Sequence, residues 1–304
     1  MSSLYNKYRP TTLKGIYGNQ ELVSSLRGMV DKNEIPHTIL LHGPTGCGKT
    51  TIGRIIATEL GAVDFDFREI DSADFRGIDT IREIRRQAHL APLRSPVKVY
   101  LIDECHKITN DGQNALLKIL EDTPKHVYFI LATTDPQKLL KTVRGRCSAF
   151  KVETLQDEQM YKLLKKVTVR EGEKGIDKEI LERIAEDSEG HPRNALQVLE
   201  QVLHTAPEKR MEMAKRQADV NTESIELARA LTQNKGWKTI SSILTGLKQE
   251  DPEGIRRMIL GYCQAVLLKS DNEKCGLIME EMLEPFYNTG FPGLTYACYS
   301  ITKN

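Results

Sequence analysis

The sequence predicts an α/β domain, a parallel sheet covered by helices on both faces, followed by two all-helical domains. Three observations lead to this prediction. Short apolar segments alternate with helical segments in the first half of the chain, this strand pattern stops near Thr154, and 304 residues exceed what one ordinary core holds. The expected domains are residues 1–153, 154–205 and 206–304.

Five short apolar segments are the predicted strands of the sheet. In chain order they are Thr38–Leu41, Asp64–Ile70, Lys98–Ile102, Val127–Ala132 and Ala149–Val152. Helices are expected between them because apolar residues recur there at spacings of three and four. In Asp111–Glu121, for example, Ala115, Leu116, Ile119 and Leu120 share one face.

Beyond the sheet, every predicted element is a helix. The second domain should contain the helices Gln156–Arg170, Asp177–Asp187 and Pro192–His204, the last entered through Gly190-His191-Pro192. Thr205-Ala206-Pro207 is the expected linker. The third domain continues as helices, with breaks near Asn234-Lys235-Gly236, Asp251-Pro252 and Asn288–Gly293.

The composition is that of an ordinary soluble protein: 39% of the residues are hydrophobic and 28% are charged. The longest apolar runs are too short to cross a bilayer, and Met1–Pro10 contains no apolar signal segment. A cytoplasmic location is therefore expected. The six cysteines include no C-x-x-C pair, which disfavours a zinc module and fits a reducing compartment. With a net charge of +1, any contact with DNA must be local or shared among several subunits.

The strongest motif follows the first predicted strand. Gly43-Pro44-Thr45-Gly46-Cys47-Gly48-Lys49-Thr50 has the form G-x-x-x-x-G-K-T and leads into a helical segment, Thr51–Leu60. Its glycines let backbone N–H groups turn towards phosphate oxygens, and the helix N-terminus adds partial positive charge. Lys49 should reach the β- and γ-phosphates of ATP, and Thr50 should bind Mg²⁺. The nucleotide contacts expected from this loop are Thr45, Gly46, Cys47, Gly48, Lys49, Thr50 and Thr51.

A second motif ends the third predicted strand. Val99-Tyr100-Leu101-Ile102 is followed by Asp103 and Glu104, and acidic groups beside a buried strand are costly unless they bind a cation or a donor. Asp103 should complete the Mg²⁺ site, while Glu104 should polarise the attacking water. Together the two motifs predict a P-loop NTPase that hydrolyses its nucleotide. The alternative for the second motif is a strand that ends in solvated acids.

Several further motifs occur in order along residues 4–205. They are Lys7-Tyr8-Arg9-Pro10, Tyr17-Gly18-Asn19-Gln20, the stretch from Asp71 to Asp79, Ala115–Glu121 and Leu131–Leu139. As an ordered set they resemble AAA+ sliding-clamp loader ATPases, in particular replication factor C small subunits and the bacterial DNA polymerase III gamma/tau subunit. The resemblance implies an AAA+ sheet domain, a small helical lid domain over the nucleotide, and a C-terminal helical collar domain for oligomerisation.

The resemblance also implies roles for single residues. Thr134 matches the sensor 1 position near the γ-phosphate, with a strand-capping threonine as the alternative. Arg146, in Gly145-Arg146-Cys147, matches the arginine that reaches into a neighbouring subunit's ATP site. Arg193 matches the sensor 2 arginine of the lid, and for both arginines the alternative is a surface salt bridge. The residues expected on the adenine side are Tyr8, Arg9, Ile16 and Tyr17.

The sequence departs from the family at several places. Gly145 stands where the family usually has serine, and His191-Pro192 stands where it usually has Gly-Ser before the sensor 2 arginine. Both changes leave the arginines in place and put only local geometry in doubt. The zinc-binding cysteines of the bacterial gamma/tau subunit are absent between Gly61 and Asp71, and no long tethering tail is expected after the third domain. A core subunit without zinc-binding cysteines and without a tethering tail would also suit a viral or archaeal-type loader.

Two segments are candidate contact surfaces. Arg76, Gly77 and Ile78 open a predicted helix, Ile78–Gln87, whose N-terminal N–H groups could hold a DNA phosphate. Alternatively, Arg76 pairs with Asp74 or Asp79. The segment Ala91–Pro96 carries exposed apolar residues that either contact the clamp or form a plain connecting loop.

The function expected from the resemblance is that of an ATPase subunit in a pentameric ring, possibly with several copies of this chain. The ring would open a sliding clamp and load it onto primer–template DNA, with ATP and Mg²⁺ as cofactors and no membrane partner. One alternative is an AAA+ ring motor that translocates DNA, like a branch-migration helicase, although such proteins usually end in a winged-helix domain. Another is a scaffold that holds nucleotide without hydrolysing it.

Overall fold

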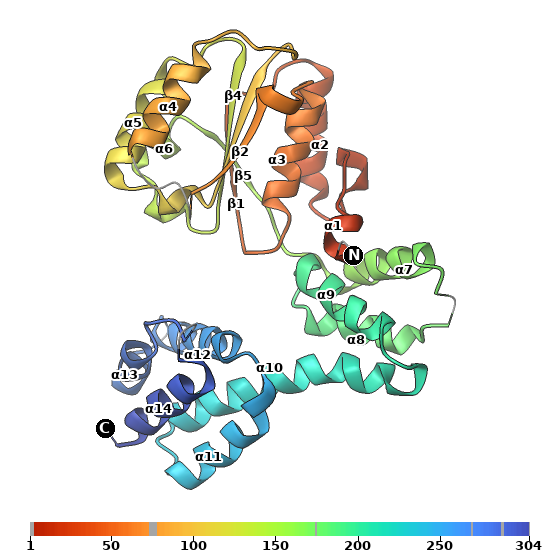
Figure 1. Cartoon of the computed structure of the whole chain (residues 1–304), viewed down its shortest axis with the longest axis vertical. Helices are drawn as coiled ribbons and strands as arrows, with labels where there is room; N and C mark the ends of the chain where they lie inside the picture. Colours follow the sequence, from red (N-terminus) through yellow and green to blue (C-terminus); the bar gives the residue numbers. More distant parts are fainter. Residues whose placement is uncertain (1–2, 73–77, 174, 269, 287–288, 304) are drawn as a thin grey trace. The chain divides into compact units, whose positions relative to one another are not determined.

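The computed structural model describes residues 3–72, 78–173, 175–268, 270–286 and 289–303. The chain divides into two compact units, Met1–Pro207 and Glu208–Asn304, which are described separately (Figure 1). The division of the first unit at residue 153 stays a prediction.

The first unit is built on one parallel five-stranded sheet with the order β2-β3-β4-β1-β5. Its strands are β1 (Thr38–His42), β2 (Phe67–Asp71), β3 (Lys98–Asp103), β4 (Val127–Thr133) and β5 (Ser148–Lys151). Because all the strands are parallel, the segments that follow them meet at one edge of the sheet. At this edge, Asp71 pairs with Asp103, and His42 pairs with Thr133.

The predicted start of the second strand was wrong by three residues. Residues Asp64–Asp66 form a 3-10 turn, and the strand begins at Phe67. The reason is the side chain of Asp66, which is 2% exposed and accepts hydrogen bonds from the backbone nitrogens of Leu93, Arg94 and Ser95 at 2.7–2.9 Å. This buried carboxylate fixes a loop, so the residues before Phe67 are not available for strand pairing.

Helices cover both faces of the sheet, as the sequence predicts (Figure 1). The helices of the first unit are α1 (Leu4–Lys7), α2 (Gln20–Asp31), α3 (Lys49–Glu59), α4 (Ile78–Ala88), α5 (Asn110–Glu121), α6 (Lys141–Arg144), α7 (Asp157–Arg170), α8 (Lys178–Asp187) and α9 (Pro192–Leu203). Alternate residues of β3 serve the two cores: Leu101 packs with α2 and α3, whereas Ile102 packs with α4 and α5. The strand therefore reads as continuously apolar because neither of its faces meets water.

The helices α7, α8 and α9 follow the sheet and pack on one another through buried residues such as Leu164, Ile184 and Leu199. Gln156 and Gln159 form a reciprocal capping box at the start of α7. Pro192 occupies the first turn of α9, where its missing N–H costs no hydrogen bond. The N-terminus of α9 lies beside the loop that follows β1: a Cβ on Gly46 would lie 3.7 Å from Cβ of Arg193.

The second unit is helical throughout its described residues. It contains α10 (Arg210–Thr232), α11 (Trp237–Gly246), α12 (Pro252–Leu267), α13 (Glu273–Glu281) and α14 (Gly290–Lys303). Two of the predicted breaks lie between helices, and Asp251 caps α12 by accepting hydrogen bonds from the backbone of Glu253 and Gly254. The predicted break Asn288–Gly293 was partly wrong, since α14 begins at Gly290.

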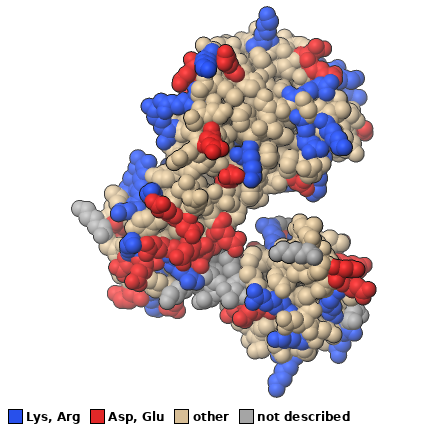
Figure 2. Space-filling view, turned by 180° about the vertical axis from the view of Figure 1, so that it is seen from behind, with Lys and Arg blue, Asp and Glu red and all other residues tan. Residues whose placement is uncertain are grey.

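Charged side chains of both signs are interspersed over the sheet-bearing part of the first unit on the face that Figure 2 shows. No field of a single sign spreads over this sheet-bearing part (Figure 2). Among the residues that the structure describes, no helix combines the length and the apolar character needed to cross a bilayer.

A buried ion pair joins α12 to the segment after α13. Glu253 and Arg256 form a salt bridge whose side chains are 5% and 10% exposed, and Arg256 also donates to the carbonyl of Met282 at 2.7 Å. Hydrogen bonds from Arg256 hold the pKa of Glu253 below its usual value against the opposing effect of burial, and the backbone N–H of Phe286 contributes further. This pair fixes the packing of α12 against the segment that follows α13.

We expect Arg256→Ala to lower the free energy of unfolding of the second unit by about 3–5 kcal/mol, because the substitution leaves Glu253 buried without its cation. The fluorescence of Trp237, the single tryptophan, reports this unit because its ring packs edge-on against Tyr299 at 5.1 Å. Arg257→Ala is the matched control, since Arg257 contacts the same carboxylate from an exposed position and should cost less than about 1 kcal/mol. Equal losses in the two variants would contradict the prediction.

The same pair predicts a direction for acid sensitivity. The pKa of Glu253 is lower in the folded chain than in the unfolded chain, so its contribution to stability is present above the unfolded value, about 4.3. It is lost as the pH falls from there through the folded value. Acid unfolding of Arg256→Ala should therefore depend less steeply on pH in this range than that of the wild type.

Candidate nucleotide site

The loop between β1 and α3 requires glycine at two positions. A Cβ on Gly43 would lie 2.0 Å from the carbonyl oxygen of Val152, closer than any side chain could be placed. Gly48 has a left-handed φ of 99° and stands directly before α3. The glycine spacing of the motif thus follows from a close backbone approach at one end of the loop and a left-handed turn at the other. Together they leave the N-terminal N–H groups of α3 available to an anion.

A cavity of about 380 Å³ lies against this loop and is lined by residues of the sheet, the N-terminal segment and the helices α7 and α9. The residues predicted in the phosphate loop, on the adenine side and at sensor 2 all lie on its wall: Tyr8, Arg9, Ile16, Tyr17, Thr45, Gly46, Cys47, Gly48, Lys49, Thr50, Thr51 and Arg193. Asp103 and Glu104 also line it. Thr134, predicted near the γ-phosphate, is not one of the lining residues. Residues far apart in the sequence are thus brought to one site, and their roles towards a nucleotide stay predictions.

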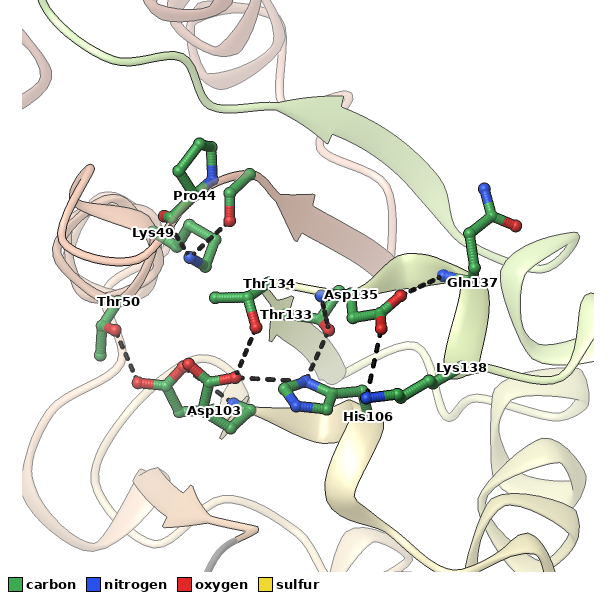
Figure 3. A network of polar contacts seen from close by, with 12 residues as sticks. Pro44, Lys49, Thr50, Asp103, His106, Thr133, Thr134, Asp135, Gln137 and Lys138 are labelled. Carbon is green, nitrogen blue, oxygen red and sulfur yellow. Dashed lines mark hydrogen bonds and ion pairs between the residues drawn. The ribbon is translucent and has the colours of Figure 1, made fainter. Parts of the chain in front are cut away.

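Lys49 is nearly buried at 5% exposure, and its ammonium group lies inside the loop (Figure 3). Its Nζ donates to the carbonyl oxygens of Gly43 and Pro44, each at 2.8 Å. Burial lowers the pKa of Lys49, while Glu104 opposes this effect. The amine is therefore a partly desolvated cation held by neutral acceptors, for which a phosphate oxygen is a stronger partner.

Thr50 and Asp103 place two hard oxygen donors together. Thr50 Oγ1 donates to Asp103 Oδ2 at 2.6 Å, and the backbone N–H of Glu104 donates to Asp103 Oδ1 at 2.9 Å (Figure 3). One carboxylate and one hydroxyl beside a phosphate-binding loop are the protein ligands that Mg²⁺ commonly takes, with waters and phosphate oxygens completing its shell. The residues present therefore fit a magnesium ion.

The side chain of Glu104, next to Asp103 in the sequence, is contacted by Thr134 and His106. Its backbone φ of 48° lies in the left-handed region, which is unusual for a residue with a side chain. Thr134, directly after β4, donates from Oγ1 to Glu104 Oε2 at 3.2 Å. Its hydroxyl therefore contacts the residue that follows β3 and does not cap β4. His106 contacts the same oxygen of Glu104, also at 3.2 Å. Sequence reasoning missed His106, because nothing in its local pattern distinguishes it from an exposed histidine.

Cationic side chains gather on the cavity wall. Arg9 and Arg193 both lie over the ring of Tyr5, with their guanidinium carbons 5.9 and 5.6 Å from its centre. Burial lowers the pKa of Arg9, and the nearby Arg54 lowers it further. Arg193 makes no ion pair with any carboxylate that the structure describes, so the surface salt bridge considered for it is not what this part of the chain shows. The cavity wall thus carries Arg9 and Arg193 beside Lys49, and cationic side chains of this kind favour an anionic ligand.

One predicted contact, Tyr8, and one residue of the wall that was not predicted, Arg54, are engaged with other groups. The hydroxyl of Tyr8 donates to Glu171 near the end of α7, and Lys7 forms an ion pair with the same carboxylate at 2.7 Å. Arg54, which sequence reasoning did not select, forms a bidentate pair with Glu69 at 2.6 and 2.7 Å on the wall of the cavity. The contacts with Glu171 connect the N-terminal segment to the end of α7, and the Arg54–Glu69 pair connects α3 to β2.

Arg146 lies apart from this cavity. Thr38, the first residue of β1, donates from its hydroxyl to the carbonyl of Arg146, whereas the phosphate loop follows the last residue of the same strand. Four steps along a strand separate these ends by about 13 Å. The Arg146 guanidinium pairs with Glu121 and donates to the carbonyl of Thr142 at 3.1 Å, with the side chain 37% exposed. Within one chain it therefore forms the surface salt bridge considered for it, away from its own phosphate loop.

The candidate DNA contact is described only in part. Arg76 and Gly77 lie outside the described residues, and Ile78 begins α4. The candidate clamp segment Ala91–Pro96 is described fully, and its Leu93 is 75% exposed. Leu90, directly before the segment, and Phe65, directly before Asp66, are 62% and 73% exposed. The carboxylate of Asp66 holds this loop rigidly, so it presents apolar side chains on a fixed backbone.

Known proteins are similar in sequence to about two thirds of the chain. A family model described as "DNA polymerase III, delta subunit" matches residues 62–156. The chain is 37% identical over 222 residues to "DNA polymerase III subunit gamma" of Buchnera aphidicola, and 34% identical over 224 residues to "DNA polymerase III subunit gamma/tau" of Mycobacterium tuberculosis. These alignments cover 66% of this chain but only 61% and 39% of those proteins. The predicted resemblance to the bacterial gamma/tau subunit is confirmed.

Solved structures share the fold. The "Thermotoga maritima RuvB Holliday junction branch migration motor" aligns with 78% of this chain and 85% of its own, with a TM-score of 0.59 and 20% sequence identity. A structure of a mutant form of the same motor aligns similarly, with a TM-score of 0.60 and 18% identity. At this identity the likeness concerns the fold alone, and it confirms the predicted AAA+ fold class.

Proposed function

We propose that this chain, a relative of the DNA polymerase III gamma/tau subunits with an AAA+ fold, is an ATP-hydrolysing subunit of a DNA sliding-clamp loader. One observation carries the proposal. Lys49, the Thr50–Asp103 pair and Glu104 line a single cavity, in a chain 34–37% identical to gamma and gamma/tau subunits over two thirds of its length. A binding site without chemistry would not need a carboxylate held beside a metal-binding pair.

In this proposal each residue has a task in hydrolysis. The loop amides and Lys49 would hold the phosphates and Thr50 and Asp103 would hold Mg²⁺, which when bound would supply charge neutralisation at the phosphate oxygens. Glu104 accepts a proton from the attacking water. Thr134 and Arg193 contact the γ-phosphate from the sheet and from α9. Arg146 completes the site of a neighbouring subunit, so hydrolysis depends on assembly.

In this proposal ATP binding assembles subunits into a pentameric ring that holds an open clamp, and hydrolysis on primer–template DNA releases the closed clamp. The helical unit Glu208–Asn304 serves as the oligomerisation collar. Arg76, Gly77 and Ile78 contact the DNA backbone, with several subunits each supplying a few contacts. The weak net charge of a single chain agrees with such shared binding.

The deciding experiment measures phosphate release by the full chain with its partner subunits, with and without clamp and primed DNA, and the native mass of the complex. Stimulation by clamp and DNA together, abolished in Lys49→Ala, is the expected result. Nucleotide binding without any hydrolysis would instead favour a scaffold.

The alternative of a DNA-translocating ring motor has less support. The likeness to RuvB concerns the fold, whereas the sequence relatives bear the names of polymerase subunits. In the described part of residues 208–304 every regular element is a helix, which disfavours the winged-helix domain expected of such motors. Sustained duplex unwinding by the purified protein would revive this alternative.

The exposed loop after α4 provides a test of clamp binding. We expect Leu93→Asp to weaken the affinity for the sliding clamp about 10- to 100-fold, because burying a leucine side chain is worth about 1.5–3 kcal/mol. Val169→Asp is the matched control: Val169 is similarly exposed, at 66%, but lies on α7. Clamp affinity is measured by fluorescence anisotropy, and an unchanged affinity for Leu93→Asp would leave the segment a connecting loop.

A further inference from the structure

His106 lies between two strands of the site without an assigned role. It belongs to a 3-10 turn, Cys105–Lys107, directly after the acidic pair, and its side chain is 12% exposed. Its Nδ1 lies 2.9 Å from Thr133 Oγ1 and 3.2 Å from Glu104 Oε2 (Figure 3). The imidazole therefore bridges the end of β4 to the carboxylate that follows β3.

The contacts of this ring depend on which of its nitrogens carries the proton. Burial lowers the pKa of His106, although Glu104 opposes the shift, so the ring is neutral at physiological pH and carries one N–H. A carboxylate only accepts hydrogen bonds, whereas the Thr133 hydroxyl, which accepts from the backbone N–H of Asp135 at 3.0 Å, can either donate to Nδ1 or accept from it. With the proton on Nδ1, the imidazole donates to Glu104; with the proton on Nε2, Nδ1 and the carboxylate would face each other as two acceptors.

With the proton on Nδ1, one oxygen of Glu104 has two donors. Thr134 and His106 both contact Oε2, while Oε1 has no hydrogen-bond partner among the described residues. A glutamate side chain on a single hydrogen bond keeps much of its rotational freedom, which a second donor from a different direction removes. The arrangement fixes the carboxylate and leaves its other oxygen available to a water molecule.

We propose that His106 is a positioning residue for hydrolysis: its Nδ1–H fixes the carboxylate of Glu104 in the orientation from which Oε1 accepts a proton. This inference rests on the proposed ATPase function. It predicts an effect on turnover and not on nucleotide affinity, because His106 does not line the nucleotide cavity.

The test compares three substitutions in the full chain with its partner subunits. The amide nitrogen of asparagine occupies nearly the position of histidine Nδ1, whereas that of glutamine reaches the position of Nε2. We expect His106→Asn to keep kcat within about threefold, and His106→Gln and His106→Ala to lower it about 10- to 100-fold, the range for a hydrogen bond to a charged group. All three variants should bind fluorescent ATP with the wild-type Kd. A kcat equal to that of the wild type in all three variants would overturn the proposal. An equal loss of kcat in all three would overturn it as well.

A second measurement does not depend on activity. The ¹⁵N chemical shifts of the His106 ring, assigned by their absence in His106→Asn, should show a neutral imidazole protonated on Nδ1. A ring protonated on Nε2 cannot donate to Glu104 and would overturn the proposal even in an active enzyme. If the wild type hydrolyses no ATP with clamp and primed DNA, the proposed function fails, while the ring spectrum still decides whether His106 holds Glu104.

Discussion

Arg146→Ala is expected to suppress clamp- and DNA-stimulated ATP hydrolysis by about 10³–10⁵-fold, the range for arginines that complete a neighbour's phosphoryl-transfer site. The guanidinium remains charged at any working pH, so it can stabilise the charge that spreads over the γ-phosphate as the bond breaks. In the single chain it lies near the start of β1 and pairs with Glu121. Because its own phosphate loop is at the far end of that strand, nucleotide affinity in the mutant's own site should be nearly unchanged.

Mixing two variants separates action in trans from a local defect. Lys49→Ala has the arginine but no usable site, and Arg146→Ala has the site but no arginine. Rings assembled from both place some intact arginines beside intact sites, so part of the stimulated activity should return. If mixed rings form, as native mass spectrometry would establish, and no activity returns, Arg146 does not act across an interface. Arg144→Ala is the matched control on the same segment, since Arg144 pairs with Gln137 instead.

Glu104→Gln should lower ATP hydrolysis by at least about 100-fold while ATP binding persists, because an amide cannot take a proton from water. The amide can still accept the hydrogen bond from Thr134, so the fold around the site should be retained. Single-turnover phosphate release and the Kd for a fluorescent ATP analogue measure the two effects separately.

Glu69→Gln is the control for this second prediction. Glu69 lines the same cavity, but its carboxylate is engaged by Arg54 on the side of β2. Its replacement should leave turnover within about tenfold of the wild type. Near-normal hydrolysis by Glu104→Gln would remove Glu104 from the role of base, and similar losses in both variants would indicate a general effect of charge in the cavity.

The sequence carried the features that local rules determine. Strand β1, the glycine loop and α3 were predictable together because an apolar run, a glycine spacing and a helix start follow one another without interruption. The acidic pair was predictable because Asp103 and Glu104 directly follow an apolar strand. Parallel strands then bring these two segments to one edge of the sheet, so that Thr50 meets Asp103.

Contacts between distant segments could not be read from one sequence. Asp66 lies in a stretch with alternating apolar residues, and only its hydrogen bonds to a loop 27 to 29 residues later make it a turn. His106 and Glu171 likewise acquire their contacts from another strand and from the N-terminal segment. A single residue in such a pair shows no periodicity, so pattern analysis has no signal to use.

The hydrogen bond from Thr38 to the carbonyl of Arg146 has a mechanical consequence for an assembled ring. Strand β1 is hydrogen-bonded on both sides, to β4 and to β5, which restricts its bending. One end of this strand continues into the glycine loop, and the other end is hydrogen-bonded to Arg146, the residue proposed to complete a neighbouring subunit's site. If Arg146 acts across an interface as proposed, a shift of the loop by a bound nucleotide would reach this residue through β1, and adjacent sites would communicate along a single strand.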